Sequence, residues 1–124
     1  MRLFRWILTP AVALACCACG GSSNSPSTPT PTPTPTGTLV SIVSGSSNLT
    51  TTAYSPNPVT VSVGGTVTWM NNDNTAHTST ANGGAFDSAT IAPGATFSRT
   101  FPTAGSFPYH CSVHPGMVGT VNVQ

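Results

Sequence analysis

Three side chains near the C-terminus carry sulfur and imidazole groups at a regular spacing of three residues. Cys111, His114 and Met117 place a thiolate, an imidazole and a thioether in one short loop, and a further histidine, His77, lies upstream. One cysteine, two histidines and one methionine form the donor set of a type 1 copper site, with a trigonal His₂Cys plane and a weak axial methionine. Soft sulfur donors favour Cu(I) and imidazole suits both oxidation states. Because protein fills all four positions, the pattern predicts electron transfer rather than catalysis.

These candidate ligands need a rigid framework, and residues 37–124 predict one made of strands. Val59, Val61 and Val63 alternate with polar residues, and the alternation resumes at Val67 and Trp69. Turn signals that contain glycine or proline recur about every 8–12 residues, which is typical of a β-sandwich or β-barrel. No helix of useful length is predicted, and Trp69 is expected in the core.

Charged side chains are rare in this sequence. They make up 4% of the 124 residues, as three arginines and two aspartates without lysine or glutamate. This composition excludes a nucleic-acid binder, which needs a basic surface, and argues against phosphoryl-transfer and glycosidase sites. Arg2 and Arg5 lie at the N-terminus, so the one arginine and two aspartates of residues 37–124 give a formal side-chain charge of −1. We therefore expect partners to be met largely through uncharged surface.

The first 21 residues resemble a secretory signal that ends in a bacterial lipobox. Arg2 and Arg5 precede a short apolar run and then small residues and cysteines. The run is shorter than the roughly 20 apolar residues of a membrane span. In a lipobox the cysteine becomes lipidated; Cys16 and Cys17 each fit the pattern in part, Cys19 fits less well, and the choice between the first two stays open. The alternative is an ordinary signal peptide. Either one predicts an extracytoplasmic protein, in a bacterial periplasm or on a cell surface.

A linker is predicted between this signal and the strand-rich part. Residues 22–36 are rich in proline, threonine and serine, and the alternate prolines from Pro29 to Pro35 favour an extended backbone. At about 3.1 Å per residue such a segment reaches roughly 45 Å. We therefore divide the chain into a signal segment 1–21, a linker 22–36 and a domain 37–124.

The ligand motifs of the domain resemble those of the plastocyanin/azurin family of blue copper proteins, the cupredoxins. The spacing Cys-x-x-His-x-x-Met is most similar to the short ligand loop of amicyanin, and a Val-x-Trp strand precedes the first histidine, as in the family. The resemblance implies an all-β, Greek-key β-sandwich that binds one copper ion. By the same resemblance, His77, Cys111, His114 and Met117 are the copper ligands.

The resemblance also implies a function. We expect a non-enzymatic, monomeric carrier of single electrons whose redox partner proteins dock near the exposed edge of His114, framed by Pro115, Gly116 and Val118. The predicted lipid anchor would provide its contact with the membrane. The alternative is a copper-binding protein that delivers or buffers the metal with the same ligands.

Two positions depart from the family pattern. Thr78 stands where relatives usually carry an asparagine that connects the two ligand loops, and Val113 replaces a common proline and frees an N–H that could reach the thiolate. His110 should point away from the copper, because adjacent strand side chains face opposite sides; we interpret it as structural. Asp73 and Asp87 are interpreted as turn residues.

Overall fold

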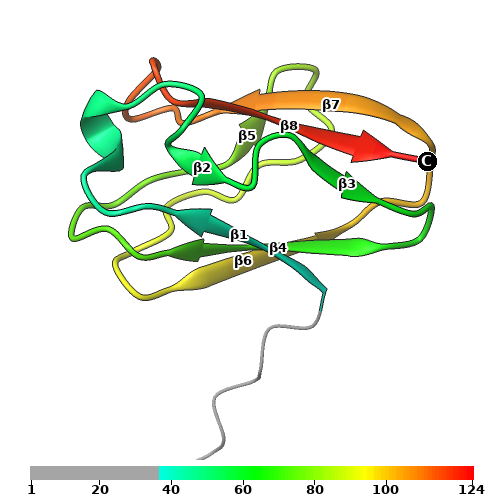
Figure 1. The fold of residues 1–124 in the computed structure, drawn as a ribbon, viewed down its shortest axis with the longest axis horizontal. Helices are drawn as coiled ribbons and strands as arrows, with labels where there is room; N and C mark the ends of the chain where they lie inside the picture. Colours follow the sequence, from blue (N-terminus) through cyan, green and yellow to red (C-terminus); the bar gives the residue numbers. More distant parts are fainter. Residues whose placement is uncertain (1–36) are drawn as a thin grey trace, which may run out of the picture. The chain divides into compact units, whose positions relative to one another are not determined.

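The computed structural model describes residues 37–124 (Figure 1). The predicted signal segment, the lipobox cysteines Cys16 and Cys17, and the linker lie outside the described residues. Within the described range, no helix is both long and apolar enough to span a membrane.

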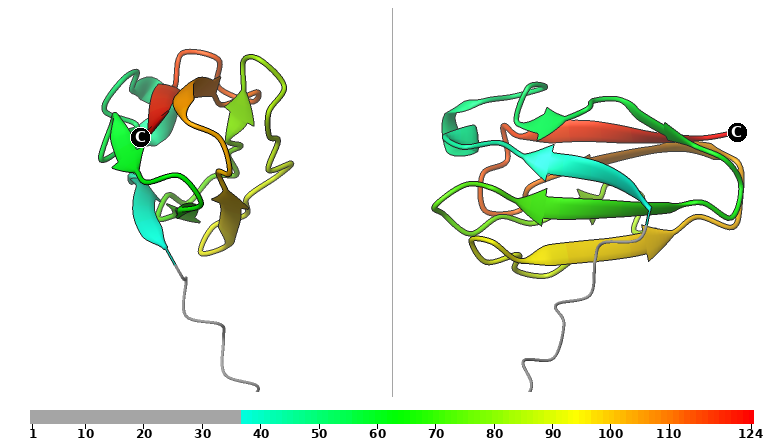
Figure 2. Two further views of the ribbon diagram at one scale, coloured as in Figure 1. Left: turned by 90° about the vertical axis from the view of Figure 1, so that its right-hand side faces the viewer. Right: turned by 60° about the horizontal axis from the view of Figure 1, so that its bottom comes forward.

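Two four-stranded sheets face each other in this domain (Figures 1 and 2). The first sheet has the order β2-β1-β4-β6, made of Tyr54–Ser55, Thr38–Ile42, Thr66–Asn71 and Thr96–Thr100. The second has the order β3-β8-β7-β5, made of Val59–Val61, Val118–Val123, Gly105–His110 and Thr80–Ala81. Successive strands mostly belong to opposite sheets, and the one helical element among residues 37–124 is the 3₁₀ turn η1, Ser46–Asn48. The predicted all-β Greek-key sandwich is confirmed.

The strand directions bring distant loops to one end of the sandwich. β1 runs parallel to β4, and β7 runs antiparallel to β8. The C-terminal ends of β1, β4 and β7 therefore lie at the left in Figure 1, together with η1. The segments that follow β4 and β7 meet there, and they contain the candidate ligands.

The core is aromatic close to this end. Trp69 in β4 is fully buried, as predicted, and its ring lies 5.3 Å from Phe86, 5.6 Å from Phe97 and 5.5 Å from Tyr109, between ring centroids. Gly119 in β8 lies against the Tyr109 ring, where an added Cβ would come within 2.8 Å of Cε2. The absence of a side chain at 119 therefore makes room for the ring.

Candidate metal centre

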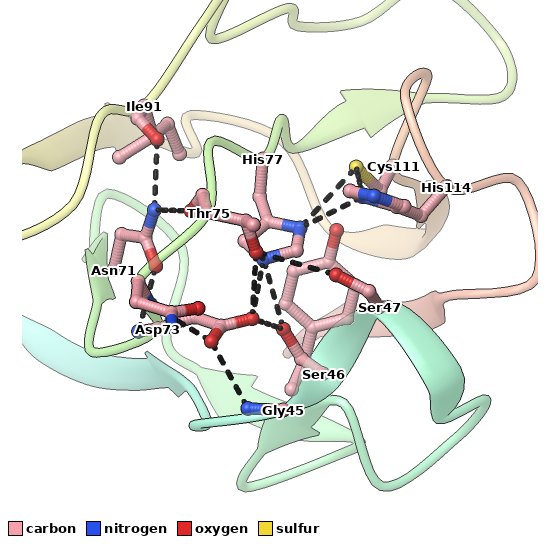
Figure 3. A network of polar contacts seen from close by, with 12 residues as sticks. Gly45, Ser46, Ser47, Asn71, Asp73, Thr75, His77, Ile91, Cys111 and His114 are labelled. Carbon is pink, nitrogen blue, oxygen red and sulfur yellow. Dashed lines mark hydrogen bonds and ion pairs between the residues drawn. The ribbon is translucent and has the colours of Figure 1, made fainter.

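Three of the four predicted ligands converge at the loop end of the sandwich (Figure 3). The donor atoms of His77, Cys111 and His114 all lie within 4.8 Å of one another. Cys111 Sγ is 3.8 Å from Nδ1 of His77 and 3.9 Å from Nδ1 of His114, and the two Nδ1 atoms are 3.2 Å apart. Bonds of about 2.0–2.3 Å from one metal ion to nitrogen and sulfur place its ligand atoms about 3–4 Å apart. The observed spacing fits one ion held by all three.

Backbone hydrogen bonds fix each of these residues. His77 lies between β4 and β5, where its N–H donates to the Ile91 carbonyl at 3.2 Å and its carbonyl accepts the Ile91 N–H at 2.8 Å. Cys111 directly follows β7, and its N–H donates to the Met117 carbonyl at 3.1 Å. The Met117 N–H donates to the His114 carbonyl at 2.9 Å, which closes the loop. Met117 itself is fully buried in this loop.

The sulfur of Cys111 is buried and accepts one backbone hydrogen bond. Cys111 is 0% exposed and is the free cysteine of the described residues. The Thr78 N–H donates to its Sγ at 3.3 Å. A hydrogen bond of this kind stabilises a thiolate in a site that water does not reach. The sequence indicated the N–H of Val113 as a candidate donor to the thiolate. The N–H that donates to the sulfur is instead that of Thr78, in the other loop.

Thr78 also connects the two ligand loops through its side chain. Its Oγ1 accepts the Ser112 N–H at 2.8 Å, and its carbonyl accepts the Tyr54 hydroxyl at 2.6 Å. Thr78 thus links the two loops at the position where the family pattern has an asparagine with this role. Tyr54, buried beside the loop, was not identified from the sequence, because it lies on a different strand and carries no motif.

Asp73 does more than the turn role predicted from the sequence. Its Oδ2 lies 2.9 Å from Nε2 of His77, and the residue is buried. The backbone N–H of Gly45 and the hydrogen bond with His77 hold the pKa of this carboxyl well below its usual range. The available sequence signal was an acidic residue four positions before a predicted ligand histidine in a domain almost without charge.

His110 lies outside the cluster. Its Nδ1 is 2.6 Å from Oδ1 of Asn82, on the part-exposed side of β7, whereas Cys111 next to it is buried. The only group of three or more His, Cys, Asp or Glu side chains suited to one metal among residues 37–124 is the His77, Cys111 and His114 cluster. The donor set of two imidazoles and one thiolate suits copper.

Comparisons with known proteins agree with this chemistry. The sequence profile of the copper-binding proteins of the plastocyanin/azurin family matches residues 41–124. A plastocyanin of Scenedesmus fuscus is 38% identical over 84 residues, and the match covers 57% of this chain and 86% of the relative. A chloroplastic plastocyanin of Tetradesmus obliquus is 37% identical over 84 residues, and the match spans 58% of its length.

Solved structures show the same fold. A purple cupredoxin of Nitrosopumilus maritimus matches with a TM-score of 0.65 and 33% identity, over 70% of this chain and 99% of that one. A Cu(I) form of an amicyanin variant matches with a TM-score of 0.61 and 28% identity, over 71% and 82% of the two chains.

The chain belongs to the plastocyanin/azurin family of copper-binding proteins. It is a cupredoxin, and copper is its cofactor. Members of this family carry electrons between redox proteins rather than catalyse reactions on a substrate.

Proposed function

We propose that this protein is a type 1 (blue) copper protein that carries single electrons between extracytoplasmic redox partners. The observation that supports this most strongly is the convergence of three soft and borderline donors within 4.8 Å, from segments far apart in the sequence. A copper ion bound by such donors supplies one-electron redox chemistry. The protein's own part is to hold the donors in place and to exclude water.

The proposed ligands are His77, Cys111, His114 and the axial Met117, for one copper ion. Three of them are completely buried, and His114 is partly exposed. A centre enclosed in this way offers no access for a substrate, while the His114 ring provides an edge at the surface. This arrangement favours electron transfer through His114 over catalysis.

Visible absorption and electron paramagnetic resonance of the purified protein with Cu(II) test this proposal. We expect the intense thiolate-to-copper band and the narrow hyperfine splitting of a type 1 site. Cys111→Ser should abolish the band while far-ultraviolet circular dichroism keeps its β signature. A colourless 1:1 complex in the unchanged protein would contradict electron transfer and favour copper delivery or buffering.

We propose further that partners dock on the uncharged surface around His114. Val113 is 55% exposed and Val118 is 37% exposed, and Pro115 and Gly116 between them are exposed as well. A weak apolar contact suits a carrier whose complexes must dissociate quickly.

The rate of electron self-exchange tests this docking surface without a known partner, because two monomers would meet through the same patch. Val113→Asp places like charges opposite each other in that encounter, and we expect exchange to slow by about five- to tenfold at low salt and to recover at high salt. Leu39→Asp, at a residue 44% exposed on β1, is the matched control and should leave the rate nearly unchanged. Equal rates in both variants would argue against docking at His114.

The N-terminal assignments complete the proposal. Residues 1–21 act as a signal, Cys16 or Cys17 receives the lipid, and residues 22–36 separate the domain 37–124 from a bacterial membrane in the periplasm or at the cell surface. The intact mass of the mature protein, with fragmentation to locate the modification, tests this. A mature N-terminus without a diacylglyceryl cysteine would contradict the anchor but leave the copper chemistry untouched.

A further inference from the structure

The side of His77 that faces away from Cys111 is occupied by a buried carboxylate. Asp73 Oδ2 is 2.9 Å from Nε2 of His77, while Nδ1 of the same ring faces Cys111 and His114 (Figure 3). His77 is 0% exposed and Asp73 is 5% exposed. The imidazole therefore lies between the carboxylate and the proposed metal, out of contact with water.

A cradle of donors from two segments holds this carboxylate. At the start of the η1 turn, the N–H of the preceding Gly45 donates to Oδ1 at 3.0 Å and the Ser46 hydroxyl donates to Oδ2 at 3.1 Å. From its own loop, the Asn74 N–H donates to Oδ1 at 2.8 Å and the Thr75 hydroxyl donates to Oδ2 at 3.0 Å. An acceptor with this many donors is satisfied in its ionised form, so the negative charge is fixed in place.

The cradle also determines which nitrogen of His77 bears the proton. The hydroxyls of Ser46 and Thr75 lie 3.1 and 3.2 Å from Nε2, but both donate their protons to Asp73. The carboxylate can only accept, so the one N–H of a neutral imidazole in this position lies on Nε2. This tautomer leaves the lone pair of Nδ1 directed at the Cys111 side.

Few other charged side chains lie in the domain with the Asp73 carboxylate. The side chains of the described residues include one other carboxylate, Asp87, which is exposed, and one arginine, Arg99, which is exposed on β6. Water screens both of these, whereas Asp73 touches a proposed ligand in a buried environment.

We propose that Asp73 is a positioning residue that holds His77 with its Nδ1 lone pair toward the metal and lowers the reduction potential of the centre. This inference rests on the proposed function for its copper readout. A fixed negative charge against a ligand favours Cu(II) over Cu(I), because the oxidised site has the larger positive charge. Partners of ligand histidines alter metal affinity by about 10- to 100-fold when they are removed.

Asp73→Asn tests the charge while an amide oxygen remains to accept from Nε2. We expect the ratio of Cu(II) to Cu(I) affinity to fall at least tenfold, which raises the midpoint potential by at least about 59 mV for one electron. The blue band should persist, because all four ligands remain. Asp87→Asn is the matched control, with the same change of charge at an exposed site. Its reduction potential should shift by only a small fraction of the shift in Asp73→Asn.

Ser46→Ala provides a second test that keeps the charge. The carboxylate loses one donor and becomes a stronger acceptor for His77, so the potential should move in the opposite direction, downward. A potential for Asp73→Asn that equals that of Asp87→Asn would overturn the electrostatic part. If Asp73→Asn does not fold, an unchanged or raised reduction potential in Ser46→Ala would overturn the electrostatic part of the proposal.

The positioning part is measured without copper. Nitrogen-15 NMR of the metal-free full chain should show His77 protonated at Nε2 and the Nδ1 resonance at the position of a bare ring nitrogen. A proton on Nδ1 would overturn the positioning role. This readout does not depend on the colour of the copper protein: a colourless complex would contradict the proposed function, and the tautomer would still decide the role of Asp73.

Discussion

Replacement of Thr78 by valine should weaken the link between the two ligand loops. Thr78→Val keeps the shape of the side chain and removes the Oγ1 that accepts the Ser112 N–H at 2.8 Å. A neutral hydrogen bond contributes about 1 kcal/mol to the free energy of unfolding. Ser112 is exposed, so water can replace part of the lost bond. We expect the free energy of unfolding to fall by about 1 kcal/mol, below most of the range of about 1–3 kcal/mol for a buried donor left without an acceptor.

Three measurements on the metal-free protein check this prediction. Urea denaturation should show the loss directly, and the thermal midpoint should fall by about 4–8 °C for a domain of this size. Amide hydrogen exchange should accelerate at Ser112, because its N–H loses its acceptor. Thr100→Val is the matched control, since it removes one hydroxyl of an exposed pair with Thr66 on the neighbouring strand β4 of the same sheet; we expect a change below about 0.5 kcal/mol.

The result that would refute this reasoning is specific. If the Ser112 amide in Thr78→Val stays as protected as in the unchanged protein, Thr78 does not hold this loop. If Thr78→Val and Thr100→Val lose equal stability, the effect belongs to threonine replacement in general and not to the connection between the ligand loops.

Two further predictions concern the aromatic core. Gly119→Ala places a methyl group against the buried Tyr109 ring and should cost about 1–3 kcal/mol, whereas Gly83→Ala, where an added Cβ meets nothing within 4 Å, should be nearly neutral; equal denaturation curves for the two variants would contradict this. Burial raises the pKa of the Tyr54 and Tyr109 phenols, the two tyrosines of the chain. Their contribution to stability is complete below the unfolded-state pKa of about 10 and is lost as the pH rises above it, by about 2–3 kcal/mol per pH unit while both ionise only on unfolding. Tyrosinate absorbance should therefore appear together with the loss of circular dichroism, and ionisation in the folded protein would show that the rings are accessible.

Three of the predicted ligands could be identified from the sequence because they lie within seven consecutive residues. Cys111, His114 and Met117 belong to one turn, so their types and spacing alone indicate the donor set. The prediction of His77 depended on the strand pattern and the resemblance to a family, since Cys111 and His114 lie more than 30 residues away from it in the sequence. The alternation of valines indicated the strands in the same way, because one face of each sheet is buried.

The contacts of Asp73 could not be predicted from the sequence. It lies in the run Asn-Asn-Asp-Asn, whose composition is typical of a turn, and the structure does place it in a bend. Its contacts with Gly45 and Ser46 join positions about 30 residues apart. Neither turn propensity nor hydrophobic periodicity contains information on contacts at that distance in the chain.

The sequence by itself determined the donor types, the strand periodicity and the near absence of charge, because each is a property of composition or of neighbours along the chain. Only the tertiary structure decided which groups complete the centre: the Thr78 N–H on the sulfur, the Thr78 hydroxyl on the Ser112 amide, and the carboxylate behind His77. The physical reason is that β1, β4 and β7 end at the same side of the sandwich. Strand pairing within each sheet and packing of the two sheets bring their loops together, and hydrogen bonds between those loops then set the environment of the candidate metal centre.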